Sequence, residues 1–203
     1  MNERSADVLG ISGQSFRAET YAVLGSTREP SVLEQAALEG RGYFFTTLDS
    51  QSLGQMYAGD RSYFKAINSS LKLREFSLGR SVKLAICPSN LRLDQTNWCL
   101  QAEQFEVVDA YSKSTVEAEF DGGKAIMLPA VGYAQLDIAY SRATGGRRLF
   151  ADFYARCLDM IDGEEVVSIG RSAEDRGLDV FESYYLTGNP AVWAVPVVVF
   201  TAK

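Results

Sequence analysis

Pairs of acidic side chains occur at several places along the chain and are candidates for acid–base or metal chemistry. They are Glu117 and Glu119, Asp159 and Asp162, Glu164 and Glu165, and Glu174 and Asp175. A hydrolase of the paired-carboxylate type needs two acids held across a cleft at a fixed separation, which nearness in sequence does not establish. Because charged side chains are mostly solvated, we interpret each pair first as surface. Asp159 and Asp162 have the spacing to share a metal ion on a helix, but they come near its expected polar end.

The chain contains no histidine. This absence excludes histidine-based acid–base catalysis, Ser-His-Asp and Cys-His arrangements, and metal sites that need an imidazole. Cys87, Cys99 and Cys157 are odd in number and widely spaced, without a C-x-x-C pair. That pattern argues against a disulfide framework or a zinc ribbon and indicates buried reduced thiols. The sequence therefore predicts no catalytic, cofactor-binding or metal-binding residue.

Two other features point weakly to ligand binding. Gly122–Lys124 forms a Gly-Gly-Lys run, but the upstream glycine, the following Ser or Thr and the strand-to-helix setting of a phosphate loop are missing. We favour a hairpin turn with a surface lysine. Aromatic side chains able to stack on a ligand ring or a sugar are Trp98, Tyr184, Tyr185 and Trp193. Aromatic residues are mostly core residues, and the sequence does not choose among these four.

Length and composition indicate one soluble globular domain over residues 1–203, with 46% hydrophobic and 23% charged residues. The net charge is −6 and the basic residues are scattered, apart from Gly145–Arg148, a short GGRR run. Nucleic-acid binders usually carry a basic face, so no nucleic-acid partner is expected. The acidic balance disfavours anionic lipid, and the most apolar run, AVWAVPVVVF, is about half the length that crosses a bilayer. We expect no membrane association and, with no signal core at the N-terminus, a cytoplasmic location.

Periodicity and capping signals predict the first half of the chain. Ser31 and Glu34 have the S-x-x-E spacing of a capping box, which predicts a helix over 31–39 that ends at the following glycines. A strand is expected over 43–48 and a short one over 7–11. A second helix begins after Asp49 or Ser50 and runs for four to five turns, with a core face made by Leu53, Met56, Tyr57, Phe64 and Ile67.

The second half is predicted to contain short strands over 82–86, 105–111 and 124–128 within the region 80–130. A long helix is expected over 145–163, because Leu149, Phe153, Cys157 and Ile161 recur every four residues. A shorter helix is expected over 172–183, followed by a strand over 189–203. Pro196 cannot donate a ladder hydrogen bond, so it suits an edge or a bulge of that strand.

One region resembles a known family. The order of the 31–39 helix, the stretch GRGYFFTT, the helix through Tyr63–Phe64 and then Lys72 is similar to the N-terminal region of the isopenicillin N synthase-like dioxygenases, which use non-haem Fe(II) and 2-oxoglutarate. The specific match covers 31–76. The match over 77–203 is weaker, and includes 101–109 as a strand and RRLFADFYARCLDMI as a supporting helix. The resemblance implies an α+β fold, with helices on a mixed or antiparallel sheet, like an incomplete double-stranded β-helix or jelly roll.

The same resemblance implies that this chain lacks the iron ligands of the family. The family binds iron through two histidines and a carboxylate, and this chain supplies neither histidine. Three hypotheses follow: an oxygenase N-terminal portion that is inactive alone, a stand-alone interaction or ligand-binding protein on the same scaffold, or an unrelated α+β domain with carboxylate or tyrosine chemistry. We also expect the apolar strand at 191–200 to be an unpaired edge that associates with a protein partner or with a missing C-terminal barrel.

Overall fold

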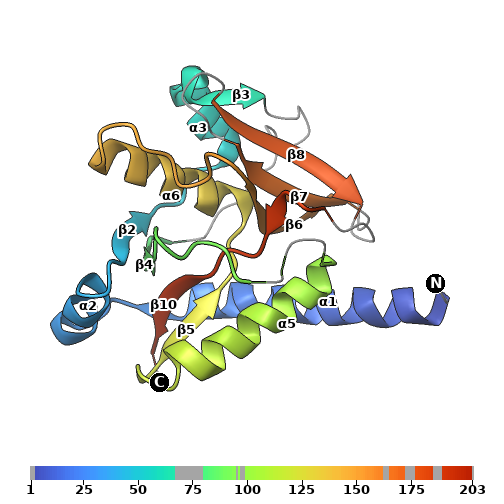
Figure 1. The fold of residues 1–203 in the computed structure, drawn as a ribbon, viewed down its shortest axis with the longest axis horizontal. Coiled ribbons are helices and arrows are strands. Elements are labelled where there is room, and N and C mark those ends of the chain that lie inside the picture. Colours follow the sequence, from blue (N-terminus) through green and yellow to red (C-terminus); the bar gives the residue numbers. More distant parts are fainter. Residues whose placement is uncertain are drawn as a thin grey trace.

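The computed structural model describes residues 3–66, 80–94, 96, 99–161, 165–171, 177–184 and 189–202, and it contains two sheets with helices packed on them (Figure 1). The first sheet has the strand order β1 (Thr27–Arg28), β10 (Val197–Thr201), β4 (Val82–Ile86) and β2 (Phe44–Leu48), and β5 (Gly123–Ile126) also pairs with β10. All of these pairs are antiparallel. The second sheet has the order β3 (Phe64–Ala66), β8 (Leu178–Tyr184), β7 (Glu165–Gly170), β6 (Tyr154–Ile161) and β9 (Val192–Trp193). Here β6, β7 and β8 form an antiparallel meander, and the outer strands β3 and β9 run parallel to their neighbours.

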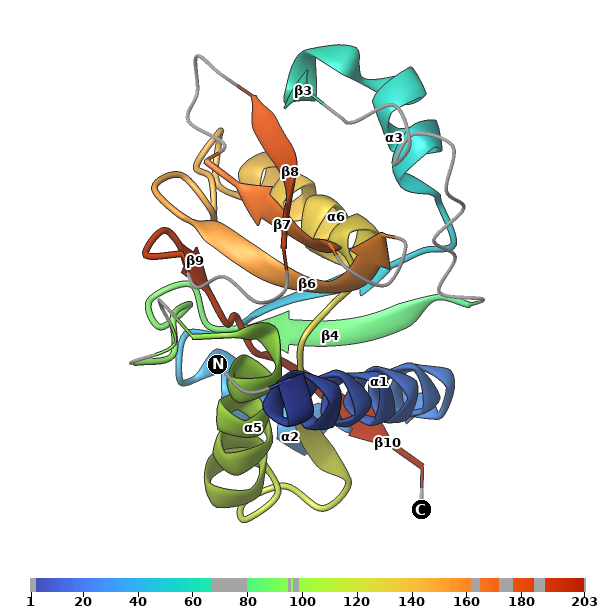
Figure 2. The ribbon, with the colours of Figure 1, turned by 90° about the vertical axis from the view of Figure 1, so that its right-hand side faces the viewer.

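The helices lie on both sides of the first sheet. Figure 2 shows α1 (Glu3–Gly25) and α5 (Gln101–Tyr111) on the face away from α6 (Ala130–Ala143), while α6 packs between the two sheets. The other helical elements are α2 (Val32–Glu39), α3 (Leu53–Gly59), the 3-10 turn η1 (Arg61–Tyr63) and the π-helical turn η2 (Ser112–Val116). Among the described residues, none of these helices combines the length and the apolar content that a bilayer crossing needs.

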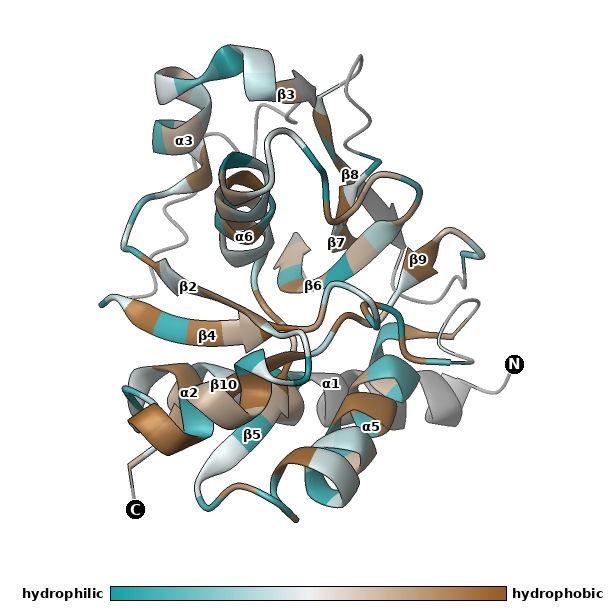
Figure 3. Ribbon diagram, turned by 60° about the vertical axis from the view of Figure 1, so that its left-hand side comes forward, coloured by the Kyte–Doolittle hydropathy of each residue, from teal (hydrophilic) through white to brown (hydrophobic). Residues whose placement is uncertain are grey.

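The main core is built around α6. Its first two turns are buried except at Gln135, and its apolar side chains belong to one cluster with residues from both sheets, among them Leu48, Leu84, Cys157 and Ile169. Figure 3, coloured by hydropathy, shows apolar and polar residues interspersed along β4 and α6. Polar residues such as Asp137 interrupt the apolar positions of α6, so the helix has no continuous apolar stripe, which explains why its periodicity gave no helix signal in the sequence.

Several predictions of local structure are confirmed. The helix over 31–39 is α2, and Ser31 and Glu34 form the capping box, with the Ser31 amide donating to Glu34 at 2.6 Å. The predicted strands over 43–48, 82–86 and 124–128 correspond to β2, β4 and β5. The α+β class is confirmed, and in the described part of the chain neither sheet closes into a barrel. The relation to a jelly roll stays a prediction.

The predicted helix over 145–163 is wrong. Residues Tyr154–Ile161 form β6, an inner strand of the second sheet. A spacing of four places side chains on one face of a strand as well as of a helix, so the pattern that predicted a helix does not distinguish the two. Cys157 is fully buried, as expected of a small apolar side chain, but on a strand.

Four further predictions need correction. The residues 7–11 lie in α1, and 105–111 lie in α5; both were expected to be strands. The helix expected from 49 to 67 ends at Gly59, because Asp60 accepts from the Tyr63 amide and starts η1, which leads into β3. In the stretch 172–183 the described part is the strand β8, which follows Gly177 at φ 69°, and residues 172–176 lie outside the described structure.

The strand expected over 191–200 is not an exposed edge. Residues 192–193 form β9, Pro196 lies between β9 and β10, and β10 is an inner strand. It pairs with β5 on one side and with β4 and β1 on the other. The prediction of an unpaired apolar strand is therefore wrong, and with it the physical reason for expecting a barrel or a partner at this strand.

Candidate functional site

Arg92 projects from the segment after β4 and contacts two aromatic rings. Its guanidinium carbon lies 5.3 Å from the ring centroid of Phe153 and 5.2 Å from that of Trp193. The two rings are neighbours because β9 pairs with β6, where Trp193 is opposite Ala155. Within the described residues no hydrogen bond or ion pair reaches the Arg92 guanidinium. Its planar set of N–H donors is thus held in place by ring contacts and left available.

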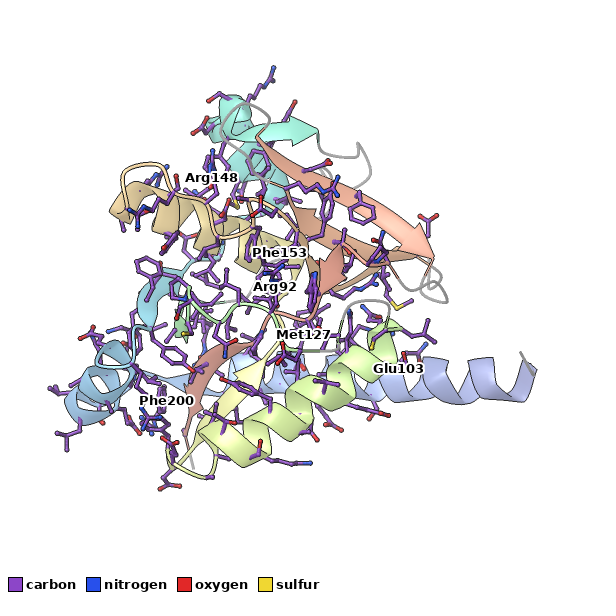
Figure 4. The ribbon with its side chains drawn as sticks, in the orientation of Figure 1. Arg92, Glu103, Met127, Arg148, Phe153 and Phe200 are labelled. Atoms are coloured by element: carbon purple, nitrogen blue, oxygen red, sulfur yellow. The ribbon has the colours of Figure 1, made fainter. Side chains whose placement is uncertain are left out.

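Two adjoining hollows meet at Arg92. One, of about 310 Å³, lies between the segment 89–94 and Trp193. The other, of about 190 Å³, lies between the segment 88–92 and the loop 148–153. Both are lined by Ser89, Leu91 and Arg92, so the two hollows adjoin at these residues, and we call the pair the arginine cleft. Figure 4 shows Arg92 beside Phe153, with Arg148 in the loop between α6 and β6.

Arg148, in the smaller hollow, is fixed by a buried carboxylate and by an aromatic ring. Its guanidinium carbon lies 3.7 Å from the ring centroid of Tyr63, and its Nη1 lies 3.6 Å from Asp137. Asp137 is fully buried on α6 and accepts hydrogen bonds from the Tyr63 hydroxyl at 2.8 Å and from the Leu149 amide at 2.7 Å. Asp137 therefore offsets the charge of Arg148 and holds the loop that forms one wall of the cleft.

Thr96 holds the other wall. Its buried hydroxyl donates to the Leu93 carbonyl at 2.7 Å and accepts from the Ala194 amide at 3.2 Å. The Leu93 amide in turn donates to the Ala194 carbonyl at 3.3 Å. Leu93 follows Arg92 and Ala194 follows Trp193, so these bonds set the position of the arginine relative to the ring.

Two consecutive hydrogen bonds between buried polar side chains hold Thr96 in place. Gln104 on α5 donates to the Thr96 carbonyl at 2.8 Å, and the Nε of Arg156 donates to Gln104 at 3.1 Å. All three residues are buried, and the exposed fraction of Arg156 is 1%. Burial disfavours the charged guanidinium and lowers the pKa of Arg156 to about 10. Charged groups buried this deeply normally have hydrogen-bond partners. Here the bonds from Arg156 to Gln104 and from Gln104 to Thr96 hold the segment that carries Thr96 in place.

Asp159, the residue weighed as a metal ligand, is not at the surface. It is buried and accepts from the Ala130 amide at 2.5 Å and from the Tyr21 hydroxyl at 3.4 Å. Ala130 is the first residue of α6, so the carboxylate lies at a helix N-terminus, where a negative charge is stabilised. Burial, with Asp159 as a second cause, raises the pKa of Tyr21 well above its usual value.

Those of the remaining candidates that the structure describes do not converge on a common site. Glu117 accepts from the Ser112 hydroxyl, and Glu119 forms an ion pair with Arg41. Gly122 takes φ 72° in a turn between η2 and β5, so the turn is confirmed, but the prediction of a hairpin with a surface lysine is wrong: the turn does not join two paired strands, and Lys124 is partly buried in β5 opposite Val199. Glu165 begins β7. Residues or side chains outside the described structure are those of Trp98, Asp162, Glu164, Glu174, Asp175, Tyr184 and Tyr185.

Cysteine and acidic residues give no further cluster. Cys157 is buried, while Cys87 and Cys99 are partly exposed, and within the described residues none of the three forms a disulfide. Burial raises the pKa of the Cys157 thiol. In the ranges that the structure describes, no group of three or more His, Cys, Asp or Glu side chains is placed to hold a metal ion.

Only partial signals for the arginine cleft are present in the sequence. Trp193 was among the four candidate stacking residues, and Arg148 belongs to the GGRR run, the one concentration of positive charge noted in the sequence. Nothing in the local sequence marks Arg92, because its partners come from distant segments. No protein-family model, curated protein or solved structure matches this chain.

Proposed function

We propose that this chain is a ligand-binding protein that holds the anionic group of a small molecule at Arg92 in the arginine cleft. The observation that carries the proposal is the Arg92 guanidinium, which two aromatic rings position and which has no hydrogen-bond or ion-pair partner among the described residues. A planar guanidinium matches the geometry of a carboxylate or phosphate and can bind it through two parallel hydrogen bonds.

The walls of the cleft support this assignment. Thr96 and the buried chain beneath it fix the segment that carries Arg92, and Asp137 fixes the loop that carries Arg148. A binding group that is already held in place loses less side-chain entropy when the ligand arrives. The larger hollow, at about 310 Å³, is at the small end of the range for ligand pockets, which suits a compound of a few heavy atoms.

A titration tests the proposal directly. Propionate and inorganic phosphate are added to the full chain, and the indole N–H signal of Trp193 is followed by NMR, with Trp98→Phe used to assign it. Arg92→Gln is expected to weaken binding about tenfold, because a charge-assisted hydrogen bond pair is lost. Arg147→Gln is the matched control, since Arg147 is an exposed arginine in the neighbouring loop and does not line the cleft.

The proposal fails if neither anion shifts the Trp193 signal, or if Arg92→Gln and Arg147→Gln weaken binding equally. Equal losses would mean that the response reports the overall charge of the protein and not a specific contact.

A second candidate function is the N-terminal part of a non-haem Fe(II)/2-oxoglutarate oxygenase, supported by the sequence resemblance over 31–76. The order of α2, β2 and α3 in 32–59 agrees with the helix–strand–helix order of that resemblance. The later stretches expected as a strand over 101–109 and as a helix over 145–163 have other structures, so the resemblance depends on 31–76 alone.

Because the chain has no histidine, Fe(II) and 2-oxoglutarate added without oxygen should give no visible charge-transfer band. A reading frame for His-x-Asp and a distant His in the following DNA would favour this candidate, and a clean intergenic region would count against it.

A further inference from the structure

The charges around the arginine cleft are mixed. The larger hollow is lined by the guanidinium of Arg92 and the carboxylate residue Asp94, with the polar residues Ser89 and Asn90 and the ring of Trp193. The smaller hollow is lined by Arg92, Arg148 and Asp152. Because Asp137 already offsets Arg148, the cleft as a whole carries no excess of positive charge. A ligand with only negative groups would meet Arg92 favourably and Asp94 unfavourably.

We infer that the ligand of the larger hollow is a small zwitterion, with its carboxylate on Arg92 and its ammonium group on Asp94. This inference rests on the proposed function, since it assigns the chemistry of the same site. A zwitterion satisfies both charged side chains at once, and Trp193 adds a ring whose face attracts a cation. Amino acids are the simplest compounds of this chemistry, and they fit a hollow of about 310 Å³.

The larger hollow suits this ligand better than the smaller one. It pairs one guanidinium with one carboxylate, whereas the smaller hollow, at about 190 Å³, places two guanidinium groups beside Asp152. An ammonium group bound near Asp152 would also lie near Arg148, whose positive charge Asp137 at 3.6 Å reduces but does not remove. Asp94 and Asp152 therefore form a natural comparison: both are exposed carboxylates in the cleft, but only Asp94 is expected to contact the ligand.

The test compares zwitterions with acids of matched length: glycine with acetate, β-alanine with propionate, and γ-aminobutyrate with butyrate. Dissociation constants are measured by NMR titration on the wild-type chain and on Asp94→Asn, Asp152→Asn and Arg92→Gln. We expect each zwitterion to bind more tightly than the acid of matched length. Arg92→Gln should weaken the binding of zwitterions and acids alike. Asp94→Asn should weaken the zwitterion and tighten the acid, each by about two- to fivefold, the size of an exposed charge interaction. Asp152→Asn should change the ratio of the two constants by less than Asp94→Asn does.

The opposite changes in affinity that Asp94→Asn should cause, weaker for the zwitterion and tighter for the acid, distinguish the inference from the proposed function. If Asp94→Asn tightens both classes of probe, or leaves their ratio unchanged, the ammonium assignment is wrong while anion binding at Arg92 stands. If no probe of either class binds the wild-type chain, the inference and the proposed function fail together. If Asp152→Asn gives the sign reversal and Asp94→Asn does not, the inference is overturned, because the ammonium group then lies in the smaller hollow.

Discussion

Thr96→Val removes one hydroxyl at the point where the two walls of the arginine cleft are joined. Valine keeps nearly the shape of threonine, so packing around this fully buried position is preserved. The bond to the Leu93 carbonyl at 2.7 Å and the bond from the Ala194 amide at 3.2 Å are lost. Arg92 and Trp193, the neighbours of Leu93 and Ala194, then lose one of the two links that fix their relative position, while the bond from the Leu93 amide to the Ala194 carbonyl at 3.3 Å remains.

The magnitude follows from these two bonds. A buried hydrogen bond contributes about 1 kcal/mol net, and a polar group left without its partner costs more. The Leu93 carbonyl keeps a longer contact with the Thr96 amide at 3.4 Å, which limits its share of the loss. We therefore expect the free energy of unfolding to fall by about 2 kcal/mol.

The assay is urea denaturation followed by circular dichroism, together with the propionate titration described above. The matched control is Thr47→Val, because Thr47 is exposed on β2 and should change stability by less than about 0.5 kcal/mol. Thr96→Val should also weaken propionate binding at temperatures where the variant is fully folded. A loss of stability no larger than that of the control would refute the role assigned to Thr96, as would unchanged binding by a destabilised variant.

Two further predictions concern charge and close packing. Arg28 lowers the pKa of Glu34 to about 2, below its value of about 4.3 in the unfolded chain. The stabilisation of the folded state by this ion pair is therefore complete above about pH 4.5 and is lost as the pH falls towards 2. Glu34→Gln should cost about 1 kcal/mol at pH 7 after allowance for solvent screening, and denaturation curves at a series of pH values should show the difference vanish near pH 2; a constant difference would contradict the ion pair. At Gly170 a Cβ would lie 2.1 Å from the Phe153 carbonyl oxygen, so Gly170→Ala should destabilise by about 3 kcal/mol. Gly59→Ala, where no atom lies within 4 Å, is its thermal-unfolding control, and equal effects of the two substitutions would show that the close approach is not the cause.

Elements with local signals could be predicted from the sequence. The capping box of Ser31 and Glu34 needs only residues three apart, and it sets the start of α2 correctly. The cap of α3 was expected at Asp49 or Ser50, whereas Ser52 makes it with Gln55. Such boundaries shift by a few residues because several nearby polar side chains can serve as caps.

Elements defined by tertiary packing could not be predicted in the same way. The spacing of Phe153, Cys157 and Ile161 fits a helix face and a strand face equally, and only the pairing of β6 with β7 and β9 decides between them. The helix α6 buries the polar residue Asp137 among its apolar residues, so no continuous apolar stripe distinguishes it in the sequence.

The arginine cleft depends on contacts between segments far apart in the chain. Arg92 follows β4, and its two rings come from the residue before β6 and from β9. The sequence marked Trp193 as one of several stacking candidates, but not the arginine that lies over it. Charge and aromatic content can be read along a chain, whereas their convergence depends on the pairing of β9 with β6.

The most direct test of the central claim is the side-chain Nε–H signal of Arg92 itself, observed by ¹H–¹⁵N NMR at low temperature and mildly acidic pH. Arg92→Lys, which removes the Nε–H group, assigns the signal. On saturation with γ-aminobutyrate or β-alanine, we predict that the Arg92 signal shifts and exchanges more slowly with water, while the signal of Arg147 stays unchanged. An unchanged Arg92 signal at saturating ligand, or equal shifts at both arginines, would contradict binding in the arginine cleft.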